Sequence, residues 1–511
     1  MTDTTTRTGN QTYRGPAGTG APRLAALPGV HRADVTPQQV IEIERYDTDD
    51  HRLTAAGITV ALHRRADEPP QWHLDLPDGD VPEHLRVPLA DAAGLSPAVP
   101  GEIDALVRGA ARERAVRPVG RIRRVRTETR LLDEDERLLA LVVHDEVTLA
   151  TLGRATDVEA WTEVELRRAE ADNALVAELE ERFAESGLRP AVLAAEEELE
   201  RLLRPTPKAR RLRAGKRGSA GAGVMEYLGA QLDRMAAEDL RVRRDEPDAV
   251  HQLRVASRRL RSALQAYRPL LDRTRTDPLV DGLRELGREL APARDAEVLH
   301  ERISSGLAGL APELLLGPVQ AQMTRHFARE QAEARAAVLA VLDSERHMGL
   351  RAALDALVER PPLTKRAARP ARKEVPALVA RTARRLERAV QVATDPAVPD
   401  SQRDAAVHSA RKAGKRLRYA TEVAKPAVGK QAKKFAKALK GFQSALGEHQ
   451  DTVVARGALR ELGAMANSAG ENGFSFGVLY GQDAARAEQI ERDLPVLWSE
   501  AWTRRNRRWL R

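Results

Sequence analysis

The order of apolar and polar residues divides the chain into two parts with different periodicities. Much of residues 40–168 alternates between apolar and polar positions or is rich in β-branched residues, as strands with one buried face are. Clusters of turn-forming residues separate these segments. The pattern predicts an antiparallel sheet with strands at 57–62, 72–76, 121–131, 138–152 and 160–167, and helices at 102–114, 173–186 and 190–203.

After residue 218 the apolar residues recur every three or four positions to the end of the chain, which is the period of an amphipathic α-helix. The predicted fold class is therefore α+β, built on an antiparallel sheet, followed by an all-α bundle. The expected helices are 224–245, 248–268, 277–291, 295–307, 319–342, 375–392 and 404–423. The expected domain limits are a disordered tail at 1–25, a sheet domain at 26–205, a basic linker at 206–217 and a helical domain at 218–511.

The helical part contains an internal repeat. Residues 251–261 align without gaps with residues 408–418, and residues 283–295 align with residues 439–451. The first residues of the first pair are 157 positions apart, and those of the second pair are 156 apart. A match of this length and spacing indicates a tandem duplication. We expect two helical-bundle repeats, at 218–365 and 366–511, related by a pseudo-two-fold axis.

Charge is distributed unevenly between the two parts. The whole chain has a formal net charge of +8, but residues 1–205 hold 26 Arg and no Lys against 38 Asp and Glu, a net charge of −12. The remaining residues hold 57 basic against 37 acidic residues, a net charge of +20. Such an excess of positive charge favours a polyanion as partner of the helical part.

Composition excludes several classes of function. The absence of Cys excludes disulfides, thiolate catalysis and zinc sites built on cysteine. Aromatic residues make up 3% of the chain, which argues against a base-stacking surface for single-stranded nucleic acid. No apolar run approaches the roughly 18–20 residues of a membrane span, so no membrane association is expected. The polar N-terminus does not read as a signal peptide, and we expect a cytoplasmic protein.

The repeat places basic residues in a stripe on each of two helices. At 100° per residue, His251, Arg254, Arg258 and Arg261 fall within an arc of about 80°. The second stripe contains His408, Arg411, Lys415 and Arg418. Such groups along about 15 Å of a helix face repel one another. Either nearby carboxylates, such as those of Asp295 and Asp451, or an external polyanion must offset this repulsion.

The repeated motif His-x-x-Arg-x-x-x-Arg/Lys-Arg-x-Arg, with the later Leu…Asp segment, resembles the CHAD family (conserved histidine α-helical domain) over about residues 218–511. The resemblance implies two similar helical bundles that bind inorganic polyphosphate along basic helix faces, and association with polyphosphate granules as a consequence to test. The histidines would gain positive charge as the pH falls toward 6. The implied binding residues are His251, Arg254, Arg258, Arg259, Arg261, Arg288, Arg294, His408, Arg411, Lys415, Arg416, Arg418 and Lys440.

The acidic part resembles the CYTH, or triphosphate tunnel, family over about residues 38–205, on segments 121–126, 131–133, 144–147 and 161–165. That family folds into an eight-stranded antiparallel tunnel, and its active members hydrolyse triphosphates with a divalent metal. Glu163 and Glu165 alternate on one strand and so point to one face, as a Mg²⁺ or Mn²⁺ pair would or as a solvent-facing pair would. The Glu-x-Glu-x-Lys strand that opens the family pattern is missing before residue 40.

The missing strand and the net charge of −12 favour an inactive, tunnel-like CYTH domain that requires no cofactor, joined to a polyphosphate-binding CHAD domain. The alternative is a metal-dependent triphosphatase or polyphosphatase in which the CHAD domain delivers substrate to the tunnel, and only then would Mg²⁺ or Mn²⁺ be needed. Nucleic acid is the disfavoured partner, since no helix-turn-helix, zinc finger or RNA-binding signature occurs. The sequence leaves the oligomeric state open.

Overall fold

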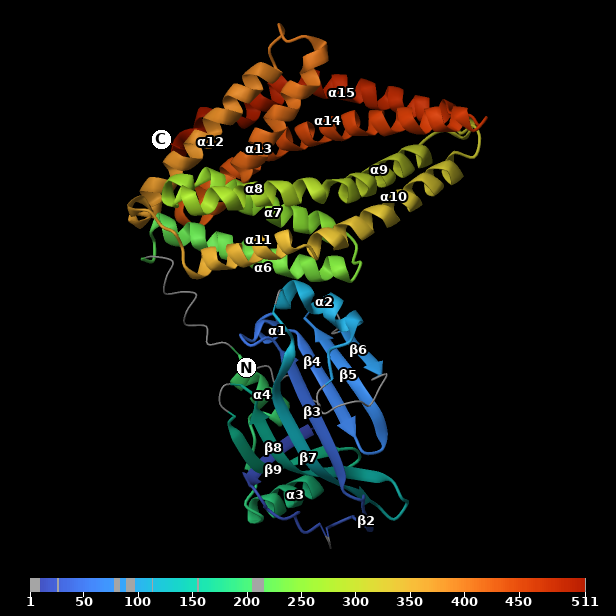
Figure 1. Ribbon diagram of the computed structural model, residues 1–511, viewed down its shortest axis with the longest axis vertical. Coiled ribbons are helices and arrows are strands. Elements are labelled where there is room, and N and C mark those ends of the chain that lie inside the picture. The colour runs from blue at the N-terminus through green and yellow to red at the C-terminus, as the bar shows by residue number, and fades with distance from the viewer. Residues whose placement is uncertain are drawn as a thin grey trace. The chain divides into compact units, whose positions relative to one another are not determined.

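The computed structural model describes residues 10–24, 27–77, 83–88, 97–112, 114–153, 156–204 and 216–510. The chain divides into two compact units, Met1–Thr206 and Pro207–Arg511. Figure 1 shows the first unit as strands with a few helices and the second as helices alone. The α+β and all-α classes predicted for the two parts are confirmed. Most of the expected linker, residues 206–215, lies outside the described residues.

The first unit is built on one antiparallel sheet. Its strands pair in the order β10-β1-β9-β8-β7-β3-β4-β5-β6, and β2 pairs with β7. The strands are β1 (Asn10–Pro16), β2 (Arg32–Val35), β3 (Gln39–Asp47), β4 (Thr59–Arg65), β5 (Glu68–Leu76), β6 (Glu83–Pro88), β7 (Arg117–Leu132), β8 (Leu138–Thr151), β9 (Val158–Arg168) and β10 (Arg189–Pro190). The helices are α1 (Arg52–Ala55), α2 (Gly101–Ala111), α3 (Asn173–Glu185) and α4 (Ala195–Leu203).

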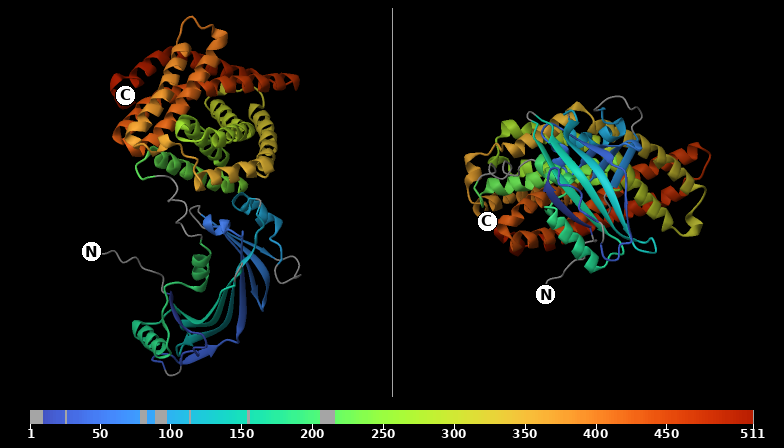
Figure 2. Two further views of the ribbon diagram at one scale, coloured as in Figure 1. Left: turned by 60° about the vertical axis from the view of Figure 1, so that its left-hand side comes forward. Right: turned by 90° about the horizontal axis from the view of Figure 1, so that it is seen from below.

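Helices cover both faces of this sheet. On β9, Trp161 and Val164 point to opposite faces because successive strand residues alternate. Val164 packs in a core with Phe183 of α3, whereas Trp161 packs in a second core with Leu199 of α4. Figure 2 shows the curved sheet with α4 on its inner side.

Two sequence expectations for this unit need correction. The disordered tail expected at 1–25 is wrong for residues 10–16, which form β1, because Tyr13 is buried against the ring of Phe183 at 5.0 Å. The sheet is also open in the described part of the chain: β6 pairs with β5, β10 pairs with β1, and the two do not pair with each other. The closed tunnel implied by the family resemblance is therefore not formed by these strands.

The second unit is all helical, and the repeated segments form corresponding helices. Residues 251–261 lie in α7 and residues 408–418 lie in α13, as predicted. The helices are α6 (Ala220–Arg243), α7 (Ala249–Ala266), α8 (Arg273–Glu289), α9 (Ala291–Ala308), α10 (Val319–Leu342), α11 (Glu345–Glu359), α12 (Ala371–Ala393), α13 (Asp400–Val428), α14 (Lys430–Ser468), α15 (Phe474–Ala501) and α16 (Arg504–Arg507). Within its described residues, 216–510, the unit also contains short 3₁₀ turns at Arg268–Leu270, Pro312–Leu314, Lys365–Ala368 and Arg508–Leu510.

The two copies differ in one helix break. In the first copy α8 ends at Glu289 and α9 begins at Ala291, while in the second copy α14 runs unbroken through the aligned position. Pro292 explains the break, because proline lacks the N–H that would bond one turn back. The aligned residue in the second copy is Glu448, which continues the helix. One apolar core, which includes Leu260 and Leu417, runs through both copies.

Candidate polyanion-binding site

The stripe helices of the two copies, α7 and α13, pack against each other. Leu253 and Leu260 of α7 and Leu417 of α13 are fully buried, and this leaves the basic residues at the margin of the core. Tyr267 at the end of α7 donates a hydrogen bond of 2.7 Å to the backbone carbonyl of Ala420 in α13. The two stripes thus come from different copies but belong to one interface.

Basic side chains of the two stripes converge. Burial lowers the pKa of Lys415 to about 7, and the neighbouring guanidinium groups of Arg411 and of Arg258, from the other copy, lower it further. Burial also lowers the pKa of Arg261, and Arg284, Arg258 and Arg416 add to the effect. Positive charges from both copies are therefore close enough to repel one another across the interface.

Four of these cations form no ion pair with a carboxylate of the described residues: Arg258, Arg261, Lys415 and Arg416. We call these four the basic junction. Asp451, which pairs with Arg411, attracts Lys415 only from a longer distance. The Nε atom of Arg258 is buried and has no hydrogen-bond partner among the residues that the structure describes. A cluster of partly buried, unpaired cations costs folding free energy, and an external anion would offset that cost.

The sequence also allowed a second arrangement, in which carboxylates neutralise the stripes. This holds for one arginine of each copy. Arg254 lies 3.4 Å from Asp295, and at the aligned position Arg411 lies 3.5 Å from Asp451. Both contacts are long for charge-assisted hydrogen bonds, which usually measure about 2.7–2.9 Å.

Arg259 and Arg418 have a different role from the junction. Both pair with Glu422, at 3.2 Å and 3.8 Å, and both guanidinium groups lie over the ring of Tyr419. Tyr227 also donates a hydrogen bond of 3.0 Å to Glu422. These contacts hold the two copies together, so these arginines are less available to a ligand than their place in the motif suggests.

The other sequence-predicted residues flank the stripes. Arg288 and Lys440 are exposed, as a ligand-binding cation would be. Arg294 forms ion pairs with Asp248 at 3.5 Å and with Glu297 at 2.9 Å, so only displacement of these carboxylates would free it.

Both histidines of the stripes have a lowered pKa. Burial lowers the pKa of His251 to about 4, and the guanidinium groups of Arg294, Arg258 and Arg254 oppose its protonation. Burial likewise lowers the pKa of His408, whose Nδ1 contacts the side chain of Gln450. The expected gain of positive charge near pH 6 is therefore wrong for His251 in the free protein.

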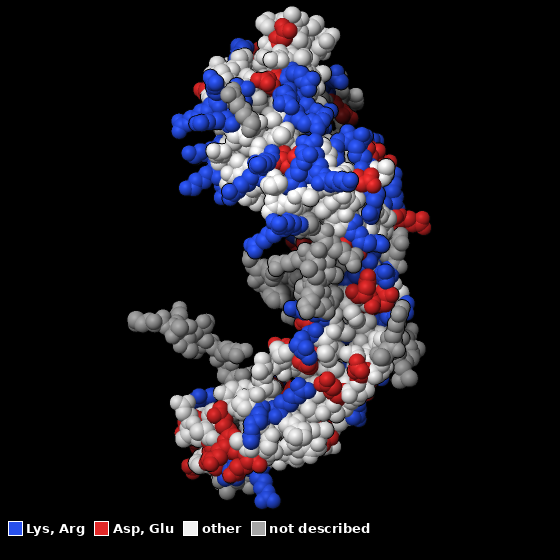
Figure 3. Space-filling view, turned by 90° about the vertical axis from the view of Figure 1, so that its left-hand side faces the viewer, with Lys and Arg blue, Asp and Glu red and all other residues white. Residues whose placement is uncertain are grey.

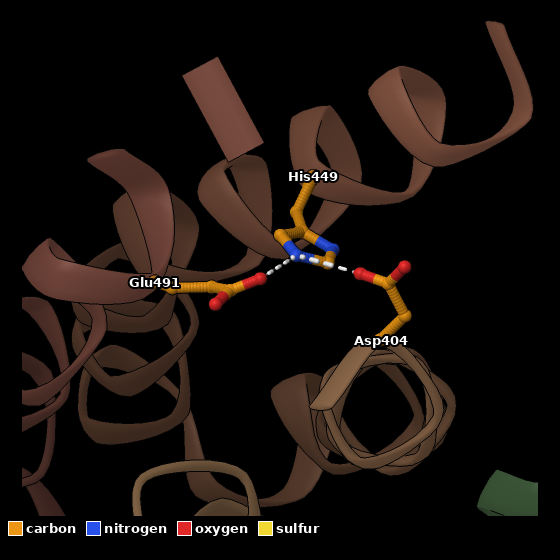
Figure 4. A group of neighbouring side chains, drawn as sticks. All are labelled: Asp404, His449 and Glu491. Atoms are coloured by element: carbon orange, nitrogen blue, oxygen red, sulfur yellow. Dashed lines mark hydrogen bonds and ion pairs between the residues drawn. The ribbon is translucent and has the colours of Figure 1, made fainter. Parts of the chain in front are cut away.

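Sequence reasoning missed a buried histidine that fixes α13 against α14 and α15. The Nε2 atom of His449 lies 2.8 Å from Glu491 and 3.5 Å from Asp404 (Figure 4). The next two residues of α14, Gln450 and Asp451, contact the stripe residues His408 and Arg411. One turn of α14 thus sets the position of the second stripe. The sequence feature that could have indicated this contact is Asp404, which lies one helical turn before His408.

The atoms of Asp404, His449 and Glu491 are close enough to hold a metal ion, and within the described ranges this is the one such group of three. However, Arg456 lies 3.3 Å from Asp404 and Arg403 lies 4.0 Å from Glu491. These arginines already compensate the carboxylates, so the group is best described as an ion-pair network that joins three helices.

Replacing His449 by alanine is therefore expected to lower the free energy of unfolding by about 2–3 kcal/mol, the scale of a buried hydrogen bond to a charged group plus a small cavity. Chemical denaturation followed by circular dichroism measures this. The control is His326→Ala, because His326 pairs with Glu330 at 3.3 Å within one helix and should contribute less than about 1 kcal/mol. Equal losses for both variants would contradict the role given to His449.

The weak metal candidates of the sheet unit are paired with arginines. Glu163 is buried and lies 3.3 Å from Arg124, which also contacts Asp145 and Glu196. Glu165 lies 2.7 Å from Arg167. Burial raises the pKa of Glu163, which Arg124 opposes. Each candidate carboxylate is thus compensated by an arginine.

Comparison with known proteins agrees with this architecture. The family model for the CHAD domain matches residues 226–460. Uncharacterized protein MT2285 of Mycobacterium tuberculosis (strain CDC 1551 / Oshkosh) is 33% identical over 500 residues, which cover 93% of this chain and 92% of that protein.

Two solved structures are also similar. PptA from Streptomyces chartreusis has a TM-score of 0.45 and 22% identity, covering 55% of this chain and 99% of that one. The CHAD domain from the plant Ricinus communis has a TM-score of 0.45 and 24% identity, covering 58% of this chain and 96% of that one.

Of the helices in the described ranges, none has both the length and the apolar character that crossing a membrane requires.

Proposed function

Because the chain belongs to the family of CHAD-domain proteins, we propose that its helical unit binds inorganic polyphosphate where the stripes of α7 and α13 meet. The observation that carries the proposal is the basic junction: four partly buried cations from two repeats, which form no ion pair with a carboxylate in the described part of the chain. A chain of phosphates matches a row of cations without any recognition of bases, and its binding releases counterions.

The chemistry of the junction suits phosphate oxygens. Arginine can hold two oxygens at once through its planar guanidinium group, and lysine contributes a compact charge. Arg254 and Arg411 would join the junction when a phosphate displaces the long contacts to Asp295 and Asp451. The site would then consist of six cations drawn from both copies.

We further propose that the sheet unit is a degenerate CYTH-like domain without hydrolytic activity. Its candidate carboxylates engage arginines, and in the described strands its sheet is open. An enzyme that cleaves polyphosphate is the second candidate, and the resemblance at residues 121–165 is what favours it.

Titration of the full-length chain with long-chain polyphosphate tests the proposal, with free phosphate assayed in the presence of Mg²⁺ and Mn²⁺. We expect tight binding that weakens steeply with salt, weaker binding of duplex DNA at equal phosphate concentration, and no phosphate release. Equal affinity for DNA would contradict polyphosphate as the specific ligand. Metal-dependent phosphate release would show that the sheet unit is an active hydrolase.

A further inference from the structure

A second group of unpaired cations lies outside the basic junction, on the outer face of α12. Arg381, Arg384, Arg385 and Arg388 are all exposed, and they follow the i, i+3, i+4, i+7 spacing that places residues on one face of a helix. None of the four forms an ion pair with a carboxylate among the residues that the structure describes. We call these four residues the α12 row.

The acidic residues of α12 are occupied elsewhere. Glu374 is buried and pairs with Arg366 and Arg369, and Glu387 pairs with Arg507 and accepts a hydrogen bond from Trp502. Figure 3 views the helical unit from the side on which α12 lies in Figure 1, and Lys and Arg side chains protrude there with few Asp or Glu between them.

The α12 row is a property of the second copy and not of the repeat. The first helix of the first copy, α6, exposes Glu226 and Asp233, and its Arg234 pairs with Glu238 at 2.7 Å. A helix in the equivalent place therefore folds without such a row. Four like charges at this spacing repel one another, so their presence on α12 calls for a role besides solvation.

The α12 row is continuous with the basic junction. Helix α12 packs along α13, which holds half of the junction. Burial lowers the pKa of Arg416, and Arg385 of the α12 row is the strongest of the neighbouring charges that lower it further. Positive charge thus extends from the interface of the two copies to the outer surface, and in the described part of the chain neither Arg416 nor Arg385 forms an ion pair with a carboxylate.

We propose that the α12 row is a second binding segment for polyphosphate, which holds the part of a long chain that extends beyond the basic junction past Arg416. This inference rests on the proposed function, because the ligand is the same. It adds that affinity depends on chain length: a short chain would fill the junction alone, and a longer one would reach both segments.

The test compares size-fractionated short and long polyphosphate, each titrated into the full-length chain at several salt concentrations. The variant is Arg381→Gln/Arg384→Gln/Arg385→Gln/Arg388→Gln, since glutamine keeps the helix propensity and removes the charge. For long chains we expect the variant to bind at least about tenfold more weakly, with a salt slope reduced by about 3, from four phosphate contacts at about 0.7 each. For short chains we expect no change.

A matched control removes the same charge elsewhere: Arg273→Gln/Arg329→Gln/Arg335→Gln/Arg492→Gln. Arg273, Arg329 and Arg492 are exposed and Arg335 is half-buried, and each of the four has a carboxylate partner. If this control variant weakens the binding of long polyphosphate as much as the α12 variant does, the loss is caused by the lower net charge alone, and the inference is overturned.

The remaining outcomes separate this inference from the proposed function. If the α12 variant binds short and long polyphosphate as the parent chain does, the α12 row is not a binding segment, but the proposed binding at the basic junction is not contradicted. If the parent binds neither length, the proposed function itself fails. If the variant loses affinity for duplex DNA but not for polyphosphate of any length, the row serves a nucleic acid and the inference is overturned.

Discussion

Replacing Arg258 and Arg416 together by alanine is expected to weaken polyphosphate binding by at least about 100-fold and, at the same time, to raise the stability of the folded chain. A hydrogen bond to a charged group contributes roughly 1.5–3 kcal/mol, so two lost phosphate contacts correspond to about 3–6 kcal/mol, and each 1.4 kcal/mol is tenfold in affinity. Equilibrium titration with long-chain polyphosphate measures the loss.

The gain in stability has a separate cause. Neither arginine has a carboxylate partner in the described part of the chain, and each lies near other cations of the junction. Removing them relieves repulsion, and for Arg258 it also removes a buried Nε atom without a partner. Residues kept for binding at a cost in stability are expected to give this opposite pair of effects.

The control for this variant is Arg329→Ala/Arg492→Ala. These arginines pair with Glu333 at 2.8 Å and with Glu488 at 3.8 Å on the surfaces of α10 and α15. It removes the same net charge, so it should change affinity by only a small factor and leave stability almost unchanged. A junction variant that binds like this control, or that is destabilised, would show that the junction cations are structural.

The local part of this structure followed from the sequence. The 3.6-residue period of apolar positions predicted α7 and α13, and the gapless repeat placed a basic stripe on each. The strands β7, β8 and β9 could also be predicted, because the alternation of apolar and polar residues along them indicates one buried face. Strand β1 was missed because its sequence, Asn-Gln-Thr-Tyr-Arg-Gly-Pro, contains a single apolar anchor, Tyr13, whose partner lies far along the chain.

What the sequence could not supply is the meeting of the two stripes. Arg258 and Lys415 are 157 positions apart, and only the packing of α7 on α13 brings their charges together. The same packing assigns Arg259 and Arg418 to Glu422 rather than to a ligand. The closure of the sheet likewise depends on pairing between distant strands, which no local pattern encodes.

The spacing of the α12 row is visible in the sequence as Arg-x-x-Arg-Arg-x-x-Arg. Only the structure shows that these arginines form no ion pair with a carboxylate of the described residues.

Binding of polyphosphate is expected to weaken as the pH rises above about 7, because Lys415 must be charged to contribute. Its pKa in the free protein is about 7, lowered by burial and then by Arg411 and Arg258. Polyphosphate brings negative charge to the ammonium group and raises this pKa in the complex. Between the two pKa values the complex holds more protons than the free partners, so affinity is highest below the lower value and falls with rising pH.

The size of this effect follows from one proton: affinity falls by up to about tenfold per pH unit, until the pH reaches the pKa of Lys415 in the complex. The variant Lys415→Arg stays charged throughout and should bind with almost constant affinity between pH 7 and 9. Calorimetry in buffers of different ionisation enthalpy measures the proton taken up at pH 8, which should be present in the parent chain and absent in the variant. Because the pKa of His251 is about 4, that imidazole is neutral over this range and adds nothing to the pH dependence of the affinity.

If Lys415→Arg keeps the full pH dependence of the parent, the proton belongs to another group, and Lys415 is not in contact with the phosphates.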